Sequence, residues 1–442
     1  MKLPILSTFL GLALTLSANA QRIPASELPK CDIGVEQPLF KTFPGKIPYR
    51  IPAIATTKNG NILAMTDYRP CGGDIGFGRV DLRYRISNNN GMTWSQELAL
   101  AEGDGITGSA TCGYGDAALV ADSRSGEVIV VCVTGNTVYG HATTTRQNPN
   151  RVAILRSFDN GHSWTKPEDI TESIYSLFDE SKLGPVASLF FGSGRIAQSR
   201  MVKHGKYYRI YAALCARPGG NRVVYSDDFG RTWKALGDIH TSPAPAGDEP
   251  KIEELPNGDV VLSSRAWGGR IYNIYKYISR RKATGVWSEP VNSAEMEGGV
   301  KAEKNACNGE ILMVDVLSTV TGKPVTLCLQ SVPLGPGRSR VGIYYKPLYS
   351  DMYFSTPTQF ASNWQGPYEV SKLPSAYSTM IQQPDGRIAF FYEEETYGKG
   401  AHYTEVYIPL CIERLTDGNF LPNTAKNRKA LKAMLKAEKA KK

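Results

Sequence analysis

Three octads decide the fold: Ser87-Asn-Asn-Asn-Gly-Met-Thr-Trp94, Ser157-Phe-Asp-Asn-Gly-His-Ser-Trp164 and Ser226-Asp-Asp-Phe-Gly-Arg-Thr-Trp233. Each fits the pattern S-x-[DN]-x-G-x-[TS]-W, and they follow one another at spacings of 70 and 69 residues. Recurrence at so even a spacing indicates one structural unit that the chain uses several times.

The octad has the composition of a turn between two strands. The Asp or Asn at its third position can accept hydrogen bonds from nearby backbone amides, and the Gly supplies the positive φ of a tight turn. Strand-like runs precede the octads, among them residues 80–86 and 151–156. We expect the Trp to pack between neighbouring sheets, so the octads predict a folding element and no catalytic chemistry.

The composition of the chain favours many short strands. Glycine (43) and proline (27) are plentiful, tyrosine (23) outnumbers phenylalanine (14), and the apolar runs are short with alternating polarity. A chain of this length usually divides into two or three domains, but closed repeat architectures are the exception because each repeat stacks on the next.

The octads resemble the Asp-box of sialidases and related propellers, with Asn89 in place of the usual Asp in the first box. This resemblance implies an all-β fold, a six-bladed β-propeller over about residues 35–420, because a repeat of about 65 residues fits that length six times. Asp-boxes also occur in propellers that are not sialidases. By themselves they therefore indicate the fold alone.

The N-terminal segment has the pattern of a signal peptide. Lys2 precedes an apolar run over residues 5–16, and small residues stand at Ala18 and Ala20. We expect cleavage after residue 20 and a secreted or periplasmic protein. A membrane anchor needs a run of roughly 20 apolar residues. No later run is long enough, so we expect no membrane span.

The formal charge of +9 comes mostly from the C-terminal end. Eight lysines and arginines lie within residues 423–442, so the rest of the chain offers no general basic surface for nucleic acid. This segment is predicted to be a basic helical or disordered tail. A weak apolar stripe within it is formed by Leu431, Met434 and Leu435.

The cysteines do not have the spacing of metal ligands. The eight of them are scattered, with no C-x-x-C pair and no interleaved histidines, which argues against a metal site. An oxidising compartment permits disulfides, but sequence does not give their pairing.

A carboxylate-binding arginine is indicated near the start of the propeller. Arg50, in Tyr49-Arg50-Ile51-Pro52, matches the [FY]-R-I-P motif that opens the catalytic domains of sialidases. The resemblance implies that it is one of three arginines that grip the substrate carboxylate. Guanidinium suits this task because it is planar, permanently charged and presents paired donors.

The resemblance also gives positions for the other two arginines. Arg265 follows a glutamate-containing strand at the expected place for the second. Arg338 fits the third position, before a strand, with Arg340 as the alternative. Arg69 is expected to stand beside the substrate as an additional cation.

The expected nucleophile is Tyr377, because residues 375–394 resemble the family's Y-S segment with its following turn and strand. Glu249 occupies the position of the glutamate that serves as the base for this tyrosine. Glu253 and Glu254 are the competing candidates for that role.

The expected acid/base residue is Asp74, on the glycine-rich loop that follows Arg69. Asp81, which enters the strand before the first octad, is a weaker alternative. The glycines do not indicate phosphate binding, because no G-K-[ST] ending follows them.

A tyrosine nucleophile suits a sugar whose anomeric carbon already bears a carboxylate. A carboxylate nucleophile would be repelled there, and sialidases are known exceptions to the two-carboxylate scheme. The pKa of a free phenol is about 10, so the tyrosine needs a base such as Glu249. Asp74 would protonate the leaving oxygen and later activate water.

The resemblance thus implies an exo-sialidase that removes terminal α-linked sialic acid with retention of configuration and needs no metal and no cofactor. Its substrates would be sialylated glycoproteins, glycolipids or oligosaccharides. Two alternatives stay open: a non-catalytic propeller that binds sialoglycans, and a trans-sialidase. Linkage preference, N-acyl specificity and oligomeric state cannot be read from the sequence.

Overall fold

The computed structural model describes residues 23–440, except 24, 30, 32, 33 and 399. The predicted signal peptide, residues 1–20, lies outside the described residues. Among the helices of the described chain, none combines the length and the apolar character that a membrane crossing needs.

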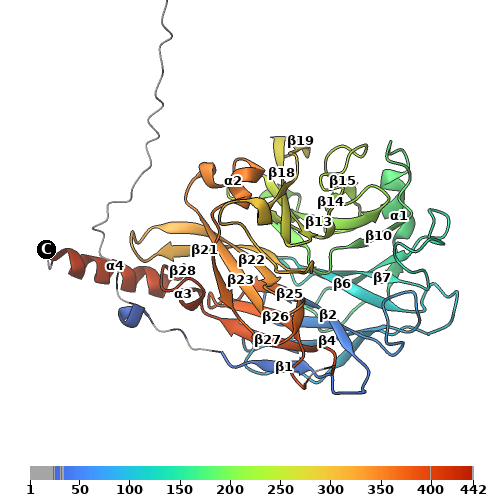
Figure 1. The fold of residues 1–442 in the computed structure, drawn as a ribbon, viewed down its shortest axis with the longest axis horizontal. Coiled ribbons are helices and arrows are strands. Elements are labelled where there is room, and N and C mark those ends of the chain that lie inside the picture. Colours follow the sequence, from blue (N-terminus) through green and yellow to red (C-terminus); the bar gives the residue numbers. More distant parts are fainter. Residues whose placement is uncertain (1–22, 24, 30, 32–33, 399, 441–442) are drawn as a thin grey trace, which may run out of the picture.

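Six antiparallel-strand sheets, called blades 1 to 6 here, follow one another around a common axis, so the six-bladed β-propeller is confirmed. The colours of Figure 1 run in sequence order around the ring. Blade 1 holds β2 (Tyr49–Thr56), β3 (Ile62–Tyr68), β4 (Asp81–Ser87) and β5 (Leu98–Ala101). Blade 2 holds β6 (Tyr114–Ala121), β7 (Val128–Thr134), β8 (Arg151–Ser157), β9 (Glu168–Asp169) and the parallel β11 (Gly194–Arg195).

The next two blades are also formed by strands that follow one another closely along the chain. Blade 3 holds β10 (Ser188–Phe191), β12 (Ala197–His204), β13 (Tyr207–Arg217), β14 (Arg222–Ser226) and β15 (Lys234–Ala235). Blade 4 holds β16 (Asp248–Glu254), β17 (Val260–Ala266), β18 (Gly269–Ser279), β19 (Thr284–Trp287) and β20 (Val291–Asn292).

The last two blades each use a strand from a distant part of the chain. Blade 5 holds β21 (Ile311–Ser318), β22 (Pro324–Pro333), β23 (Val341–Leu348), β24 (Gln365–Glu369) and β28 (Phe420–Pro422). Blade 6 holds β25 (Ser375–Gln382), β26 (Ile388–Glu394), β27 (Thr404–Leu410) and β1 (Gln37–Phe40). Because β1 pairs with β27, the N-terminal side of the chain closes the last blade and the ring.

The helices of the described chain are short, apart from the last. They are α1 (Thr171–Tyr175), α2 (Pro357–Ala361), α3 (Ile412–Leu415) and α4 (Ala425–Ala440). Short 3₁₀ turns lie at Ala25–Glu27, Ser176–Phe178, Ser293–Glu295 and Asp351–Tyr353.

The core is divided into layers between neighbouring blades. Buried apolar side chains of blades 1 and 2 form one cluster, and the other five blade pairs around the ring form similar clusters. Blade 6 packs on blade 1 through Ile381 and Phe391 against Ile54 and Ile62. Both faces of the inner strands are therefore buried, and each large side chain contributes about 1.5–3 kcal/mol.

The octads form turns between strands and connect the blades at the rim. In the second box, Asp159 accepts hydrogen bonds from the amides of His162 (3.1 Å) and Ser163 (2.9 Å). The ring centroid of Trp164 lies 6.1 Å from that of Tyr84 in blade 1. The expected packing of the box tryptophan against a neighbouring blade is therefore present.

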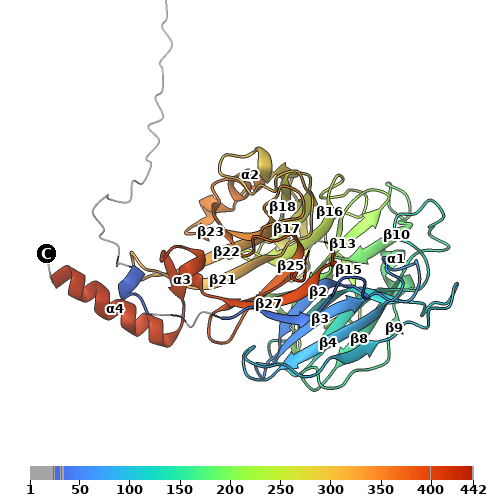
Figure 2. The ribbon, with the colours of Figure 1, turned by 60° about the horizontal axis from the view of Figure 1, so that its bottom comes forward.

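The basic C-terminal segment forms helix α4, which extends from the blade 5 side of the ring beside β28 and α3 (Figures 1 and 2). Its apolar stripe docks on the propeller. Leu431 is buried against Leu317 and Leu421 of blade 5, and Met434 and Leu435 are partly buried beside it.

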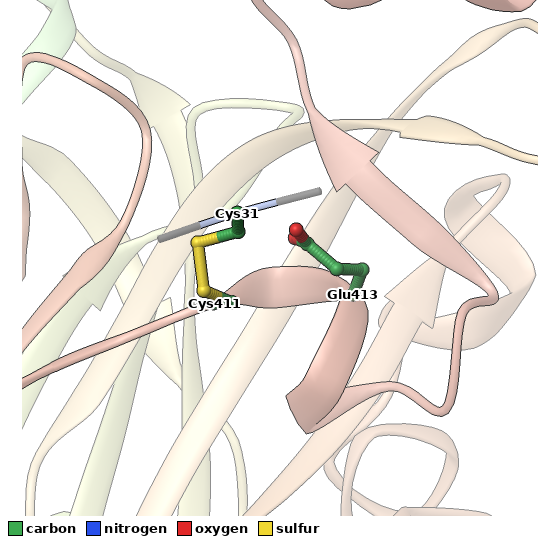
Figure 3. A group of neighbouring side chains, drawn as sticks. All are labelled: Cys31, Cys411 and Glu413. Atoms are coloured by element: carbon green, nitrogen blue, oxygen red, sulfur yellow. A yellow bond between two sulfur atoms is a disulfide. The ribbon is translucent and has the colours of Figure 1, made fainter. Parts of the chain in front are cut away.

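A disulfide between Cys31 and Cys411 joins the segment before β1 to the end of blade 6 (Figure 3). The carboxylate of Glu413 lies next to it, and these three residues are close enough to suggest a metal site. Because a metal needs thiolates and these sulfurs are bonded to each other, the group is a structural link. The remaining cysteines are free thiols: the exposed Cys71 and the buried Cys112, Cys132, Cys215, Cys307 and Cys328.

Candidate active site

The candidate site lies where four inner strands begin. Arg50 is the second residue of β2, Asp116 the third of β6, Glu249 the second of β16 and Tyr377 the third of β25. Since the inner strands surround the axis, their first residues meet at one mouth of the propeller.

Each of these four strands departs from regular pairing at that point. The registers shift between residues 50 and 53, 115 and 118, 248 and 250, and 375 and 378. Such β-bulges bend a strand and redirect its side chains. The repeated bulge therefore turns one polar side chain of each strand into the mouth.

A cavity of about 300 Å³ occupies this mouth. Its lining combines charged groups with an apolar wall. The charged and polar members are Arg50, Asp74, Asp116, Asp248, Glu249, Arg265, Arg338 and Tyr377. The apolar members are Ile51, Ile75, Val133, Val138, Tyr139 and Phe190.

Tyr377, Glu249 and Arg265 form a hydrogen-bonded triad. The Tyr377 hydroxyl donates to Glu249 Oε1 in a short hydrogen bond. Arg265 Nη1 donates to Glu249 Oε2 at 2.8 Å and to the Tyr377 oxygen at 3.2 Å. The side chains of Tyr377 and Glu249 are buried, with exposed fractions of 7% and 9%. A hydroxyl, a carboxylate that can accept its proton and a guanidinium are thus held together.

The surroundings of Tyr377 keep its proton in place. Burial, then repulsion from Glu249, raises the pKa of the Tyr377 hydroxyl well above its ordinary value, while Arg265 and Arg50 act in the lowering direction. The phenol is therefore neutral in the resting site, and its ionisation requires transfer of the proton to an acceptor. Glu249 is the carboxylate that already accepts a hydrogen bond from this hydroxyl.

Arg50 is held from behind by a buried glutamate. Its Nε donates to Glu393 Oε1 at 2.7 Å, and the amides of Ile51 (2.8 Å) and Tyr377 (3.0 Å) donate to the same carboxylate. Burial raises the pKa of Glu393, but Arg50 and these two amides outweigh it and lower the pKa overall. An ionised Glu393 thus fixes the direction of Arg50.

Three arginines surround the tyrosine. The guanidinium carbons of Arg50 and Arg338 lie 5.3 and 5.5 Å from the Tyr377 ring centroid, and Arg265 contacts its hydroxyl. Arg340 instead donates to Glu369 at 2.8 Å, away from the cavity, and its side chain is 48% exposed. The structure therefore brings Arg338 to the site and leaves Arg340 outside it.

Asp74 lies at the open side of the cavity. Its side chain is 72% exposed and accepts a short hydrogen bond from Arg69 Nη1. Arg69 is buried and is anchored by Asp67 at 2.9 Å. The weaker candidate Asp81 is fully buried, pairs with arginines of its own blade and does not line the cavity.

Glu253 and Glu254, the rivals of Glu249, have structural partners further along β16. Glu253 pairs with Arg195. Glu254 accepts hydrogen bonds from the Ser199 hydroxyl and the Arg200 amide. Neither lines the cavity at the mouth.

Sequence reasoning missed Asp116 and Glu393. Asp116 lines the cavity, donates its amide to Asp67 at 3.0 Å and has a φ of 54°. Burial and the negative charge of Asp67 raise the pKa of Asp116 to about 8. The signals available were weak: a Gly-Asp pair at the start of a strand, and a strand ending in Tyr-Glu-Glu.

The site can bind an acid that also carries an apolar group. Three guanidinium groups face the cavity from one side, where a carboxylate would satisfy them. Val138, Tyr139 and Phe190 supply an apolar wall from blades 2 and 3. A larger hollow of about 1080 Å³ at the outer edge of blade 2 contains none of these groups, and its Arg146 and Arg151 are paired with carboxylates.

Comparison with known proteins agrees with the fold and with the motifs. The BNR/Asp-box repeat family matches residues 224–235, which include the whole third octad. The sialidase of Micromonospora viridifaciens is 25% identical over 362 residues, which are 79% of this chain and 50% of that protein. The chain spans about half the length of several curated sialidases that it matches.

Solved structures share the architecture. The intramolecular trans-sialidase of Ruminococcus gnavus, in complex with oseltamivir carboxylate, gives a TM-score of 0.65 at 16% identity, over 85% of this chain and 98% of that one. The Trypanosoma rangeli sialidase, in complex with 2,3-difluorosialic acid as a covalent intermediate, gives 0.60 at 17% identity, over 87% and 59%. At such identity these likenesses show the fold.

Proposed function

Because this chain is a relative of the sialidases, we propose that it is an exo-sialidase that hydrolyses terminal α-linked sialic acids with retention of configuration. The observation that carries the proposal is the triad of Tyr377, Glu249 and Arg265 at the centre of a cavity with two further arginines. A binding-only propeller has no need of a buried tyrosine bonded to a base.

In the first step, the Tyr377 oxygen forms a bond to the anomeric carbon as the bond to the glycosidic oxygen breaks. The phenolic proton passes to Glu249, with which it already shares a hydrogen bond. Protonated Asp74 gives its proton to the leaving oxygen from the open side of the cavity. The aglycone departs as an alcohol.

In the second step, a water oxygen bonds to the anomeric carbon as the bond to the tyrosine oxygen breaks. Asp74 takes a proton from that water, and Glu249 returns its proton to Tyr377. Two displacements at one carbon give overall retention.

The arginines hold the substrate carboxylate during both steps. Arg50, Arg265 and Arg338 approach from β2, β17 and the loop before β23, so the carboxylate and the ring are fixed relative to the tyrosine. Such positioning lowers the barrier by removing the entropy cost of alignment. Positive charge close to the phenol also favours the developing phenolate.

The substrates we propose are sialylated glycoproteins, glycolipids or oligosaccharides outside the cytoplasm, in the extracellular space or the periplasm. The signal-peptide pattern of residues 1–20 supports this location. The absence of a required metal or cofactor stays a prediction.

The test is release of a fluorophore from an α-sialoside by wild type and by Tyr377→Phe. We expect wild type to release it and the variant to lose about 10³-fold in kcat, because the nucleophile is gone. Near-normal hydrolysis by the variant would overturn the assignment.

A second measurement tests the covalent step. 2,3-Difluorosialic acid should label wild type on Tyr377, detectable by mass spectrometry of peptides, and should not label the variant. Product analysis separates hydrolysis, which yields free sialic acid, from intramolecular or intermolecular transfer.

A further inference from the structure

A second buried glutamate lies opposite the one that holds Arg50. In the antiparallel pairing of β26 with β27, Glu393 faces Glu405 directly. Both side chains are fully buried. Two carboxylates in facing positions of a sheet repel each other, so they are not expected to be ionised together.

The two glutamates differ completely in their hydrogen bonds. Glu393 accepts from Arg50 and from the amides of Ile51 and Tyr377, as an ionised carboxylate requires. For Glu405, neither carboxyl oxygen has a hydrogen-bond partner among the described residues. A buried carboxylate without partners is strongly disfavoured, whereas a neutral carboxyl group is tolerated.

The groups that face Glu405 come from three strands. Glu393 on β26 and Asp67 on β3 are acidic, and Arg50 on β2 is basic but already paired with Glu393. Thr66 lies against Glu405 and acts in the direction that lowers its pKa, but the Thr66 hydroxyl donates to the Arg50 carbonyl at 2.8 Å. Burial, then repulsion from Glu393, raises the pKa of Glu405 well above its ordinary value.

We propose that Glu405 is a positioning residue that keeps a proton in the working protein, so that Glu393 alone carries the charge that directs Arg50 toward the substrate carboxylate. The pair shares one proton, and the hydrogen bonds place it on Glu405. Its role in substrate binding rests on the proposed function, whereas its protonation does not.

The proposal links the site to pH in a defined direction. Ionisation of Glu405 at alkaline pH would add a second negative charge beside Arg50. That charge would offset the positive field that the substrate carboxylate meets, so binding would weaken. The effect should therefore be a rise in KM at alkaline pH, with a smaller change in kcat.

Infrared difference spectroscopy tests the proton directly. A protonated carboxyl group has a C=O stretch above the amide band. Subtracting the spectrum of Glu405→Gln from that of wild type near neutral pH should show this band, and the band should vanish as the pH is raised. Glu394→Gln is the matched control, since Glu394 is the next residue of β26, is also buried, and contacts Tyr392 and Thr396 instead of Arg50.

Kinetics tests the asymmetry of the pair. Because glutamine mimics a neutral carboxyl group, Glu405→Gln should keep KM within about twofold at mildly acidic pH and lose most of the alkaline rise in KM. Glu393→Gln should raise KM about tenfold or more at every pH, because Arg50 loses the carboxylate that orients it. The reverse ranking would overturn the proposal.

The outcomes separate the two proposals. Absence of the infrared band means that Glu405 is ionised and refutes its protonation, whatever the activity. A band with no alkaline rise of KM in wild type refutes the link to Arg50. A band in a protein that does not cleave sialosides refutes the proposed function and leaves the protonation standing. If Glu405→Gln does not fold, Glu405→Met serves for the same subtraction.

Discussion

Both the rim turns and the mouth of the propeller contain a repeated feature. At the rim the repeated feature is a set of side chains, and at the mouth it is a bulge in the backbone. At the rim, the three octads use the same side chains for the same hydrogen bonds, as Asp159 and Asp228 show with the amides of Ser163 and Thr232 (2.9 and 2.8 Å). At the mouth, four inner strands share a bulge but place Arg50, Asp116, Glu249 and Tyr377 there.

The difference shows how a repeated fold accommodates one chemistry. Every rim turn closes in the same way, so the same types of side chain recur and accept hydrogen bonds from the backbone amides of the turn. At the mouth, the backbone device recurs while each blade contributes a different functional group. The candidate functional residues therefore lie at positions where the backbone is the same in several blades but the side chain differs from blade to blade.

The mouth holds local backbone strain, as do the octads, in which Asn90, Asn160 and Phe229 have φ values of 59°, 61° and 58°. Ile51 is β-branched yet has a φ of 65°, a region that such residues rarely adopt. Its amide is held by Glu393 at 2.8 Å, which stabilises this conformation and aims Arg50. Strain of this kind is maintained by surrounding contacts and is typical of functional sites.

The largest effect should come from a change at the mouth. Glu249→Gln removes the base beside Tyr377 while keeping its size, so kcat should fall about 10³-fold with a change in unfolding free energy below about 1 kcal/mol. Sialoside hydrolysis and denaturant unfolding on the same samples measure both. If activity falls only in proportion to the loss of folded protein, Glu249 acts on stability, as the rim residues do, and the prediction is wrong.

At the rim the balance should be reversed. Asp159→Ala leaves the turn amides of the second box without their acceptor, which should cost about 1–2 kcal/mol of unfolding free energy and leave kcat within twofold. Partial burial raises the pKa of Asp159, but hydrogen bonds, led by those from Ser163, lower it overall to about 2. Its contribution is therefore present above about pH 4, and the difference between the proteins should shrink as the pH falls toward 2.

A smaller effect is expected from Asp116, the partly buried acid of the mouth. Since burial and Asp67 raise the pKa of Asp116 to about 8, folding takes up a proton between about pH 4 and pH 8. Its stabilising contribution is complete below about pH 4 and is lost as the pH rises to 8. Between about pH 5 and 6, wild type should lose about 1 kcal/mol more unfolding free energy than Asp116→Asn. Parallel denaturation curves at the two pH values would speak against this.

The smallest effect concerns the one box that departs from the others. Asn89 accepts from the Thr93 amide at 2.9 Å as a neutral amide oxygen. Asn89→Asp would make this a charge-assisted hydrogen bond and should raise the unfolding free energy by about 0.5 kcal/mol. Thermal unfolding at neutral pH measures the gain, and no increase would mean that the first box does not need the charge.

The chemistry-bearing residues were largely readable because they sit in local motifs. Arg50 follows from its tetrapeptide, Asp74 from its glycine-rich loop and Tyr377 from its strand segment. Glu249 and Arg338 were harder, because each had a nearby rival of the same charge. Only the folded chain separates them, since Glu253 pairs with Arg195 and Arg340 pairs with Glu369 outside the cavity.

The sequence by itself determined the repeat, the turn chemistry and the identity of the groups that can react, because these depend on residues close together in the chain. Only the tertiary structure decided that β1 completes blade 6, that Cys31 pairs with Cys411, and that Glu393 and Glu405 face each other behind Arg50. The first two relations join segments more than 300 residues apart, and the third sets a pair on neighbouring strands against Arg50, which lies 343 residues before Glu393. No local pattern specifies them, since they exist only once the ring of blades has closed.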